Sequence, residues 1–385
     1  MKFILFGFFT HMGGAQQATS DFLCHLHNRG YEVEFVDAYG ELPEHEALIK
    51  KAGVKYTALH RQPRYPKIGL ENRPVARKIK MLASIPNLLV VSYRLRLYLK
   101  ETRPDAVIVI SEKGLRILDF SSRGLNSRII FWCHGKQISQ SVFQGKYGKR
   151  VDMYFCLSET ARAASIANGA PSKKISILPN AIDADLLLDK SKKPLLNSLP
   201  DSNKPIKLLV PATLIPLKGQ DCSVRALGSL VRDGYDAVLY LAGDSPNGDL
   251  YYSDKLSTIA KQEGVLDRVY FLGWRTDIPQ IMRQSTAVLL LSHSEGMPLS
   301  IIEALTLGCP VIATPVGSIP EMLENENLGK IVEIDNYLEC KAAVLDIVNA
   351  NKYGCKVKAS NSGAIERYSV RNQMKLFELG VDDDS

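Results

Sequence analysis

The chain has 385 residues, which is more than one hydrophobic core usually organises, so we expect two domains. Hydrophobic residues make up 45% and charged residues 23% of the sequence, as in ordinary globular proteins, and no run of 18 or more apolar residues predicts a membrane-spanning helix. The formal net charge of +7 is unevenly spread, because residues 61–103 contain eleven Lys/Arg and only two acidic residues.

Seven cysteines occur without any C-x-x-C pair, which indicates a reducing compartment and argues against a disulfide framework or a zinc site. The N-terminal stretch MKFILFGFF could be mistaken for a signal peptide. Its apolar run is short, however, and THMGGAQQ follows it without an A-x-A cleavage site. We therefore predict that this stretch forms the first β-strand.

In the first half of the chain, short apolar runs rich in Val, Ile and Phe alternate with segments of helical pattern. The runs are continuous, which is typical of a parallel sheet buried on both faces by helices. Predicted strands are residues 2–9, 31–38, 54–59, 106–111, 128–134, 153–157 and 175–178, and predicted helices include 15–29, 76–100 (interrupted near Pro86) and 159–168.

Residues 188–205 are polar and contain three prolines, so we predict a linker there. The alternation then restarts and predicts a second doubly wound α/β domain. Its predicted strands are residues 206–211, 237–242, 269–272, 287–292 and 311–314, and its predicted helices are 222–232, 253–263, 278–284 and 299–307. Ligands of open α/β sheets bind beyond the carboxyl ends of the strands, so we expect a ligand cleft between the two domains.

The stretch SHSEGMPLSIIEALTLG, residues 292–308, follows a predicted strand and enters a helix near Pro298. Glu295 would lie in the loop and Glu303 in the first two helical turns, about 12 Å apart along a straight helix. The free backbone N–H groups at the helix start, with the helix dipole, make an anion site. This arrangement suits a ligand with phosphate and sugar hydroxyls. The plainer alternative is that Glu303 only satisfies local N–H groups.

Several stretches in the right order resemble glycosyltransferase family 4, whose members are retaining GT-B enzymes. The family's Glu-x7-Glu region is similar to SEGMPLSIIEALTLGCPVIATPVGSIPEML, and its N-terminal glycine loop, helix and second strand to HMGGAQQATSDFLCHLHNRGYEVEFV. The family's next two motifs are similar to LKETRPDAVIVIS and IIFWCHG. The end of its first domain is similar to ILPNAID, and its returning final helix is similar to ERYSVRNQMKLFELG.

The resemblance implies two Rossmann-like doubly wound domains that face each other across a cleft. Residues 1–187, completed by a returning C-terminal helix at 366–385, would form the acceptor-binding domain. Residues 206–365 would form the nucleotide-sugar-binding domain, after the linker at 188–205.

The resemblance also implies roles for the two glutamates. Glu303 would accept hydrogen bonds from the nucleotide ribose hydroxyls, and Glu295 would contact the donor sugar. The backbone of the four residues after Glu295 would hold sugar hydroxyls or the diphosphate: Gly296, Met297, Pro298 and Leu299.

Lys218 follows a predicted strand, where a lysine can reach a diphosphate as a point charge. Alone, it could equally be a solvated surface lysine. The family has a comparable stretch in which an arginine and a lysine both bind the diphosphate, and Lys218 matches the lysine. The arginine position is Thr213 here, so either another basic residue or the helix N-terminus must take over its part.

Three further features of the sequence match motifs of the family. Gly13 and Gly14 follow the first strand, where glycine allows positive φ and close approach to a ligand, although a tight turn is the simpler interpretation. The resemblance places this loop over the donor diphosphate, next to the acceptor. His134 ends a strand; the resemblance places it near the donor sugar, while a structural histidine is the alternative, and we do not assign it as a general base. The last motif is the base-binding turn, which comprises Gly273, Trp274 and Arg275.

Asp183 and Asp185 superficially match the D-x-D metal signature of other glycosyltransferases. They fall at the domain junction, away from any expected phosphate. We therefore expect an enzyme without metal or other cofactor, in which the nucleotide-diphosphate sugar is a substrate.

The basic segment mixes its charges with apolar residues, which is typical of a helix that lies on an anionic membrane. The alternative is a helix that packs on the sheet and exposes its charges to water. Nucleic acid is a weaker alternative, because no matching motif accompanies the charge. The residues of this predicted membrane and acceptor surface are Arg73, Arg77, Lys78, Lys80, Arg94 and Arg96.

The sequence thus predicts retaining transfer of a hexose or N-acetylhexosamine to a glycan or lipid-linked acceptor, in bacterial surface polysaccharide synthesis. By resemblance, the acceptor attacks from the leaving-group face and the departing phosphate takes its proton. We expect a cytoplasmic protein at the inner face of the membrane. Two alternatives stay open: an epimerase or phosphorylase of the same architecture, and a non-catalytic nucleotide-sugar-binding subunit, which the departure at Thr213 slightly favours.

Overall fold

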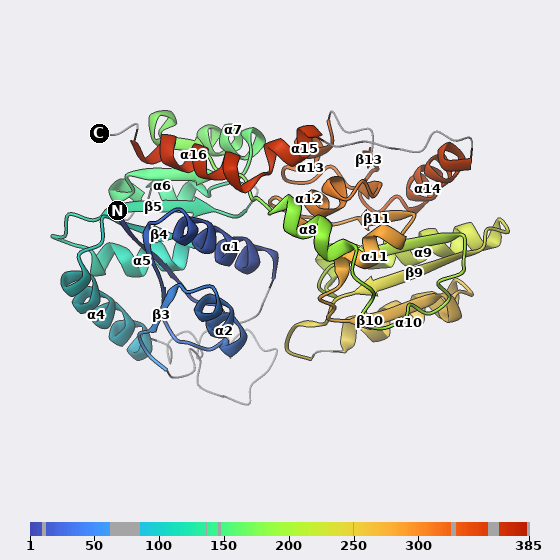
Figure 1. Ribbon diagram of the computed structural model, residues 1–385, viewed down its shortest axis with the longest axis horizontal. Coiled ribbons are helices and arrows are strands. Elements are labelled where there is room, and N and C mark those ends of the chain that lie inside the picture. The colour runs from blue at the N-terminus through green and yellow to red at the C-terminus, as the bar shows by residue number, and fades with distance from the viewer. Residues whose placement is uncertain are drawn as a thin grey trace. The chain divides into compact units, whose positions relative to one another are not determined.

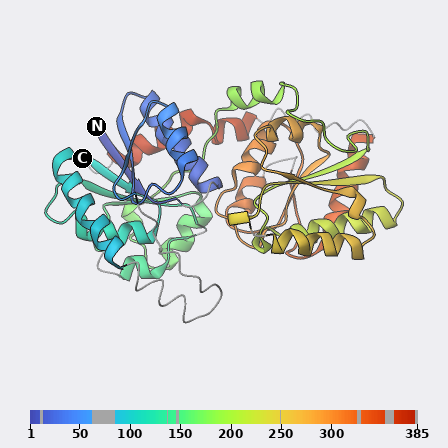
Figure 2. The same ribbon diagram turned by 90° about the horizontal axis from the view of Figure 1, so that it is seen from below.

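The computed structural model describes residues 1–9, 13–61, 85–135, 137–144, 148–248, 250–324, 329–352 and 362–382. The chain forms two compact units, one of Met1–Leu178 with Met374–Ser385 and the other of Pro179–Gln373 (Figure 1). Each unit is built around one parallel sheet, with helices beside it (Figure 2).

The first unit contains a seven-stranded sheet in the order β3-β2-β1-β4-β5-β6-β7. The inner strand β1 pairs in parallel with β2 on one side and β4 on the other, so that Phe3 lies opposite both Val33 and Ala106. The strands are β1 (Lys2–Gly7), β2 (Glu32–Asp37), β3 (Lys55–Ala58), β4 (Ala106–Val109), β5 (Arg128–Cys133), β6 (Met153–Cys156) and β7 (Ile175–Ile177).

Helices cover both faces of this sheet because its strands carry apolar side chains on both sides, as the continuous apolar runs predict. The α-helices are α1 (Gly14–Asn28), α2 (Pro43–Lys51), α4 (Ile85–Thr102), α5 (Glu112–Ser121), α6 (Gln140–Gln144) and α7 (Glu159–Ala167). The final helix, α16 (Val370–Asp382), returns to this unit and is red in Figure 1. Its Phe377 packs edge-on against Phe3 and Phe22. The expected returning helix is therefore present.

The second unit contains a six-stranded parallel sheet in the order β10-β9-β8-β11-β12-β13. Its strands are β8 (Ile206–Pro211), β9 (Ala237–Ala242), β10 (Val269–Gly273), β11 (Ala287–Leu290), β12 (Val311–Ala313) and β13 (Gly329–Ile331). Its helices are α8 (Ala184–Ser191), α9 (Gln220–Arg232), α10 (Tyr251–Gln262), α11 (Ile278–Gln284), α12 (Leu299–Thr306), α13 (Ile319–Leu323), α14 (Tyr337–Lys352) and α15 (Ser362–Arg367). Two doubly wound α/β units are thus confirmed.

The chain passes from the first unit to the second after Leu178. Asn180 already donates to Met297 O, Ile182 donates to Tyr368 O, and α8 packs against α11 and α12. The expected linker, residues 188–205, accordingly lies within the second unit. Its proline-rich sequence follows a helix that is already part of that unit.

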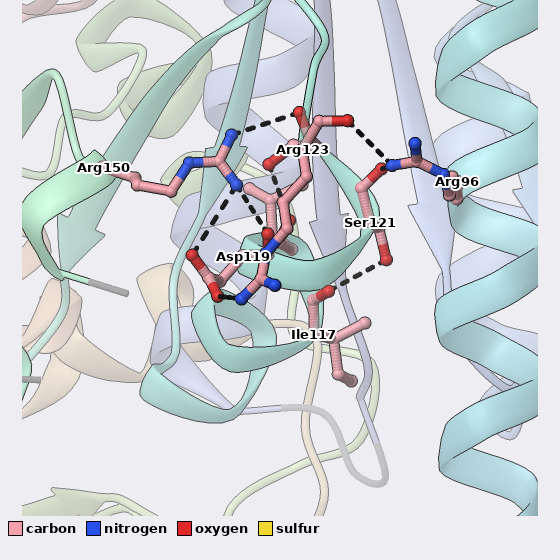
Figure 3. A network of polar contacts seen from close by, with 8 residues as sticks. Arg96, Ile117, Asp119, Ser121, Arg123 and Arg150 are labelled. Atoms are coloured by element: carbon pink, nitrogen blue, oxygen red, sulfur yellow. Dashed lines mark hydrogen bonds and ion pairs between the residues drawn. The ribbon is translucent and has the colours of Figure 1, made fainter. Parts of the chain in front are cut away.

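Arg96, Arg123 and Arg150 lie around the C-terminal end of α5 (Figure 3). Arg150 donates to Asp119 O and Ser122 O at 2.6 and 3.2 Å, and Arg96 of α4 donates to Arg123 O at 2.8 Å. Carbonyl groups at and just beyond the end of a helix have no partner within the helix, so these bonds satisfy them and place positive charge at the negative end of the helix dipole.

This network bears on the predicted membrane surface. Arg96 is used to join α4 to the end of α5, and Arg94 donates to Leu59 O at 2.6 Å. Both guanidinium groups therefore have a structural task that the sequence did not reveal. The other four predicted surface residues lie outside the described residues: Arg73, Arg77, Lys78 and Lys80.

Candidate active site

The centre of the candidate site is an ion pair between Lys218 and Glu295. Lys218 ends the short 3-10 turn after β8, and Glu295 lies in the loop after β11. Because β8 and β11 are parallel neighbours, their carboxyl ends meet at one edge of the sheet. Lys218 Nζ therefore lies 2.7 Å from Glu295 Oε1, although 77 positions separate the two residues.

Glu295 is held from a second side as well. Ser292 Oγ donates to the same Oε1 atom at 2.7 Å, and the Glu295 side chain is only 8% exposed against 22% for Lys218. A buried carboxylate is costly unless it is paired and hydrogen-bonded, and here it is both. The pair thus presents a partly exposed ammonium group at the edge of the sheet where a ligand of this fold binds.

Gly219 allows the two loops to approach this closely. Its φ is +65°, and a Cβ there would lie 1.9 Å from Leu291 O, so no other residue fits. His293 N also donates to Leu217 O at 2.8 Å, which fastens the loop after β11 to the turn that carries Lys218. The backbone therefore fixes the distance between the two charged side chains.

Helix α12 begins directly behind Glu295. Pro298 is its N-cap, and Leu299 is its first residue, as the sequence predicts. Glu303 lies in the second turn and is partly buried, whereas Met297 is 5% exposed. The first amides of α12 are directed to the same edge of the sheet as Lys218, where they favour an anion.

The remaining predicted donor residues lie at neighbouring strand ends. Thr213, at the family's arginine position, accepts a hydrogen bond through its carbonyl oxygen from Gln220 Nε2 at 2.8 Å. Gly273 has φ +65° at the end of β10, and Trp274 after it is 61% exposed.

The side chain of Arg275 is already bonded to other residues of the protein. Its Nε and Nη2 atoms bond to Asp277 at 2.7 and 2.6 Å, and its Nη2 also donates to Asn197 O. The guanidinium group lowers the pKa of the buried Asp277 carboxyl, which in turn accepts from Leu196 N. Arg275 thus holds the segment at 196–197 to the predicted base-binding turn, so its guanidinium group is already bonded within the protein.

In the first unit, the glycine pair lies at the start of helix α1. Gly13 has φ −158°, an extended conformation open to any residue, and a Cβ at Gly14 would meet nothing within 4 Å. Neither residue needs positive φ. The backbone conformation therefore does not require glycine at these two positions, and the expected approach of this loop to the donor diphosphate stays a prediction.

His134 follows β5, with its ring centroid 4.2 Å from that of Trp132. The residue is partly exposed, but both ring nitrogens are buried and have no hydrogen-bond partner among the described residues. Burial lowers the pKa of His134 to about 3, so the ring is neutral at physiological pH. A neutral imidazole with two unpaired nitrogens can donate one hydrogen bond and accept another from a ligand.

The acidic pair at 183–185 has a structural explanation. Asp183 is the N-cap of α8, and its Oδ1 accepts from Leu186 N at 2.9 Å. Within the described ranges, no group of three or more His, Cys, Asp or Glu side chains is arranged to hold a metal ion. Over the same ranges, no helix is both long and apolar enough to cross a membrane.

Two families match the chain in sequence. The family "Glycosyltransferase Family 4" matches residues 12–186, and the family "Glycosyl transferases group 1" matches residues 192–360. Together the two matches cover both units. They divide the chain close to the point where the structure changes from one unit to the other.

Curated relatives are similar over part of the chain. A UDP-Gal:alpha-D-GlcNAc-diphosphoundecaprenol alpha-1,3-galactosyltransferase of Escherichia coli is 28% identical over 54% of this chain and 54% of its own length. A lipopolysaccharide 1,6-galactosyltransferase of Salmonella typhimurium is 25% identical over 59% of this chain and 61% of its own length. The chain thus spans about half the length of the curated relatives it matches.

Solved structures share the whole fold. HepE of Anabaena in complex with UDP has a TM-score of 0.77 at 20% identity, covering 99% of this chain and 100% of its own. The lipopolysaccharide outer core galactosyltransferase WaaB has a TM-score of 0.70 at 21% identity, with full coverage of both chains. The two matching families and the GT-B fold agree with the strand-end geometry, and the chain belongs to glycosyltransferase family 4.

Proposed function

We propose that the protein transfers a hexose or N-acetylhexosamine from a nucleotide-diphosphate sugar to a hydroxyl of a glycan or lipid-linked acceptor. The observation that carries the proposal is the Lys218–Glu295 pair, which lies beside the first amides of α12 at one edge of a nucleotide-binding type of sheet. Relatives named as galactosyltransferases of lipid-linked and lipopolysaccharide acceptors support the acceptor class, and a neighbour in complex with UDP supports the donor class.

In the proposed reaction, the bond between the sugar anomeric carbon and the diphosphate oxygen breaks, and a bond to the acceptor oxygen forms. Lys218 and the α12 amides stabilise the negative charge on the departing diphosphate, which takes the acceptor's proton. Glu295 binds a sugar hydroxyl, and Glu303 binds the ribose. For the neutral His134 ring we propose a hydrogen bond to the sugar.

The reaction is proposed to retain the anomeric configuration, since the acceptor and the leaving group use the same face of the sugar. It is also proposed to need no metal, because Lys218 and the helix amides supply the positive charge that a metal would otherwise provide. Turnover that is unchanged by a chelator would support this, and turnover abolished by it would overturn it.

The proposal is tested by incubating the chain with a panel of UDP-, GDP- and ADP-sugars and measuring release of the nucleoside diphosphate. We expect slow release of the nucleoside diphosphate from one donor. Lys218→Met should lower the rate of this release about 100-fold, because removing one preorganised contact to a developing charge lowers kcat by about that factor in other enzymes. Lys330→Met is the matched control, because Lys330 forms a surface ion pair with Asp346 in the same unit.

Three results would contradict the proposed function. Binding of a donor without turnover would point to a non-catalytic subunit. An epimerised nucleotide sugar would identify an epimerase, and a sugar phosphate formed in the presence of inorganic phosphate would identify a phosphorylase.

We also propose peripheral contact with an anionic membrane through α4, on the cytoplasmic face of the cell membrane. Three apolar side chains spaced four residues apart share one face of α4: Leu89, Tyr93 and Leu97 are 64%, 60% and 48% exposed. Lys100 on the same helix is exposed and basic, and so is Arg94, although its Nη1 is bonded to Leu59 O. An exposed apolar face with basic neighbours fits the boundary between lipid headgroups and acyl chains.

Sedimentation with vesicles tests this contact. We expect salt-sensitive binding to anionic vesicles, weaker binding to neutral ones, and about tenfold loss of binding in Leu89→Asp, since burial of a leucine in lipid contributes at least that much. Leu338→Asp is the control, because Leu338 is 55% exposed on α14 of the other unit. Equal sedimentation with both kinds of vesicle, or equal loss in both variants, would rule the contact out.

A further inference from the structure

The loop that carries Glu295 is hydrogen-bonded from behind at two successive carbonyl groups and closely approached at the carbonyl group before them. Gly296 O accepts from both Ser318 N, at 3.0 Å, and Ser318 Oγ. Met297 O accepts from Asn180 Nδ2 at 2.8 Å. Gly317 lies against the third carbonyl, since a Cβ there would be 2.2 Å from Glu295 O.

These contacts determine where the amides of the loop point. In a trans peptide the N–H is directed opposite to the C=O of the preceding residue, and no cis peptide occurs among the described residues. Because the carbonyl groups of Glu295 and Gly296 face Gly317 and Ser318, the N–H groups of Gly296 and Met297 face the other way. Neither N–H has an acceptor among the described residues.

Asn180 is unusual for a packing residue. It is 3% exposed, and only one orientation of its amide places a donor at Met297 O, so the assignment of its atoms is unambiguous. Its Oδ1 is consequently buried without a partner in the described part of the chain. An unpaired buried acceptor destabilises the fold, so a residue selected only for packing would avoid it.

We infer that Asn180, Gly317 and Ser318 are positioning residues that orient the Gly296 and Met297 amides toward the distal phosphate of the donor. The inference rests on the proposed function and names the part of the chain that prepares the site. The amides are aligned before the ligand arrives, so binding needs no reorientation of peptide dipoles. This compensates for the arginine that Thr213 replaces.

Calorimetric titration tests the inference with the nucleoside diphosphate that the wild-type chain prefers among UDP, GDP and ADP, and with the matching monophosphate. We expect Asn180→Ala and Ser318→Ala to bind the diphosphate about tenfold more weakly, because misaligned amides lose a hydrogen bond to a charged group. Binding of the monophosphate should change less than twofold, because it lacks the distal phosphate.

Matched variants separate positioning from folding. Ser318→Thr keeps a hydroxyl and should restore diphosphate binding. Asn168→Ala removes the same kind of bond, from Nδ2 to Ile138 O at 3.2 Å in the first unit, and should leave both affinities unchanged. Thermal denaturation of each variant shows whether it is folded.

The ratio of the two affinities decides the matter. If a variant lost affinity for both nucleotides equally, or for neither, the ratio would be unchanged. That result would overturn the inference and leave the three residues with a packing role only. A wild-type chain that binds none of the nucleotides would instead contradict the proposed function itself, so the two failures are distinguishable.

Discussion

At the scale of single residues, the structure changes what is expected of Glu295. Its carboxylate holds Lys218 before any ligand binds. Removing it leaves the lysine without its partner and free to contact a diphosphate. The first glutamate of the motif is thus a partner of the cation as well as a candidate sugar ligand.

We therefore predict that Glu295→Ala abolishes most sugar transfer but preserves or slightly strengthens binding of the free nucleoside diphosphate. Glu303→Ala should weaken that binding about tenfold, since it removes a charged acceptor for the ribose hydroxyls. Titration calorimetry and turnover measurements separate the two effects, with Asp346→Ala as a surface control. If both glutamate variants lost nucleotide affinity equally, this division of roles would be wrong.

A second residue-scale prediction concerns pH. His45 in α2 is fully buried against Phe9 and Phe35, and burial lowers its pKa to about 4. The unfolded chain takes up the proton near pH 6.5, so the stability contributed by the neutral ring is complete above that pH and is lost as the pH falls toward 4. The free energy of unfolding should drop by about 3 kcal/mol over this range.

Urea denaturation at pH 7 and pH 5 should detect about 2 kcal/mol of this drop, since the folded ring is still mostly neutral at pH 5. His45→Gln should make the stability less sensitive to pH, while His27→Gln, at an exposed position, should leave the pH dependence of the wild type unchanged. Equal pH dependence in the wild type and His45→Gln would show that His45 is not the titrating group.

At the scale of elements, the end of α5 shows how arginines substitute for a helix cap. Arg150 donates to two carbonyl groups there and lies 3.6 Å from Asp119 Oδ1 (Figure 3). We predict that Arg150→Ala destabilises the first unit by about 1–2 kcal/mol, because two carbonyl groups lose a charged donor. Arg116→Ala, whose ion pair with Glu112 is long at 4.0 Å and solvent-exposed, should cost less than about 0.5 kcal/mol. Chemical denaturation compares them, and equal losses would mean that the network contributes no more than a surface pair.

At the scale of the whole molecule, the residues proposed to bind the nucleotide all lie in the second unit. We predict that a nucleoside diphosphate slows hydrogen exchange in the segments at 213–220 and 292–303, because a ligand stabilises the structure that binds it. Peptides from α2 in the first unit should exchange at the same rate with and without ligand. Protection confined to the first unit would show that the nucleotide binds there, which would contradict the proposed site in the second unit.

Much of the architecture was predictable from sequence, because buried parallel strands give short continuous apolar runs. Strand β4, AVIV, and strand β11, AVLL, are examples. The glutamate loop was also predictable, since a strand, a loop and a proline-started helix follow one another within a few residues. Its pairing with Lys218 was not predictable, because it depends on β8 and β11 being neighbours in the sheet.

The contacts of several other residues could not be predicted from the sequence either, because they also depend on which segments the fold brings together. Asn180 and Ser318 act on the loop across 117 and 22 positions, and nothing local marks either side chain as a donor to it. Arg96 looked like free surface charge and is bonded to α5, and Arg275 looked like part of a base site and is bonded to Asp277. The role of the two motif glycines was suggested by the family resemblance and by their position after a strand, and it stays a prediction.

The glycines of this chain also set limits on how its sequence can drift. A Cβ at Gly219 would overlap a carbonyl oxygen of the neighbouring strand end, and one at Gly317 would overlap the glutamate loop, while one at Gly14 would occupy empty space. In a library of random variants selected for activity, replacements at Gly219 and Gly317 should be depleted, whereas alanine at Gly14 should persist. Backbone packing therefore tolerates a side chain at the conspicuous double glycine, whereas the fold cannot exchange the two isolated glycines.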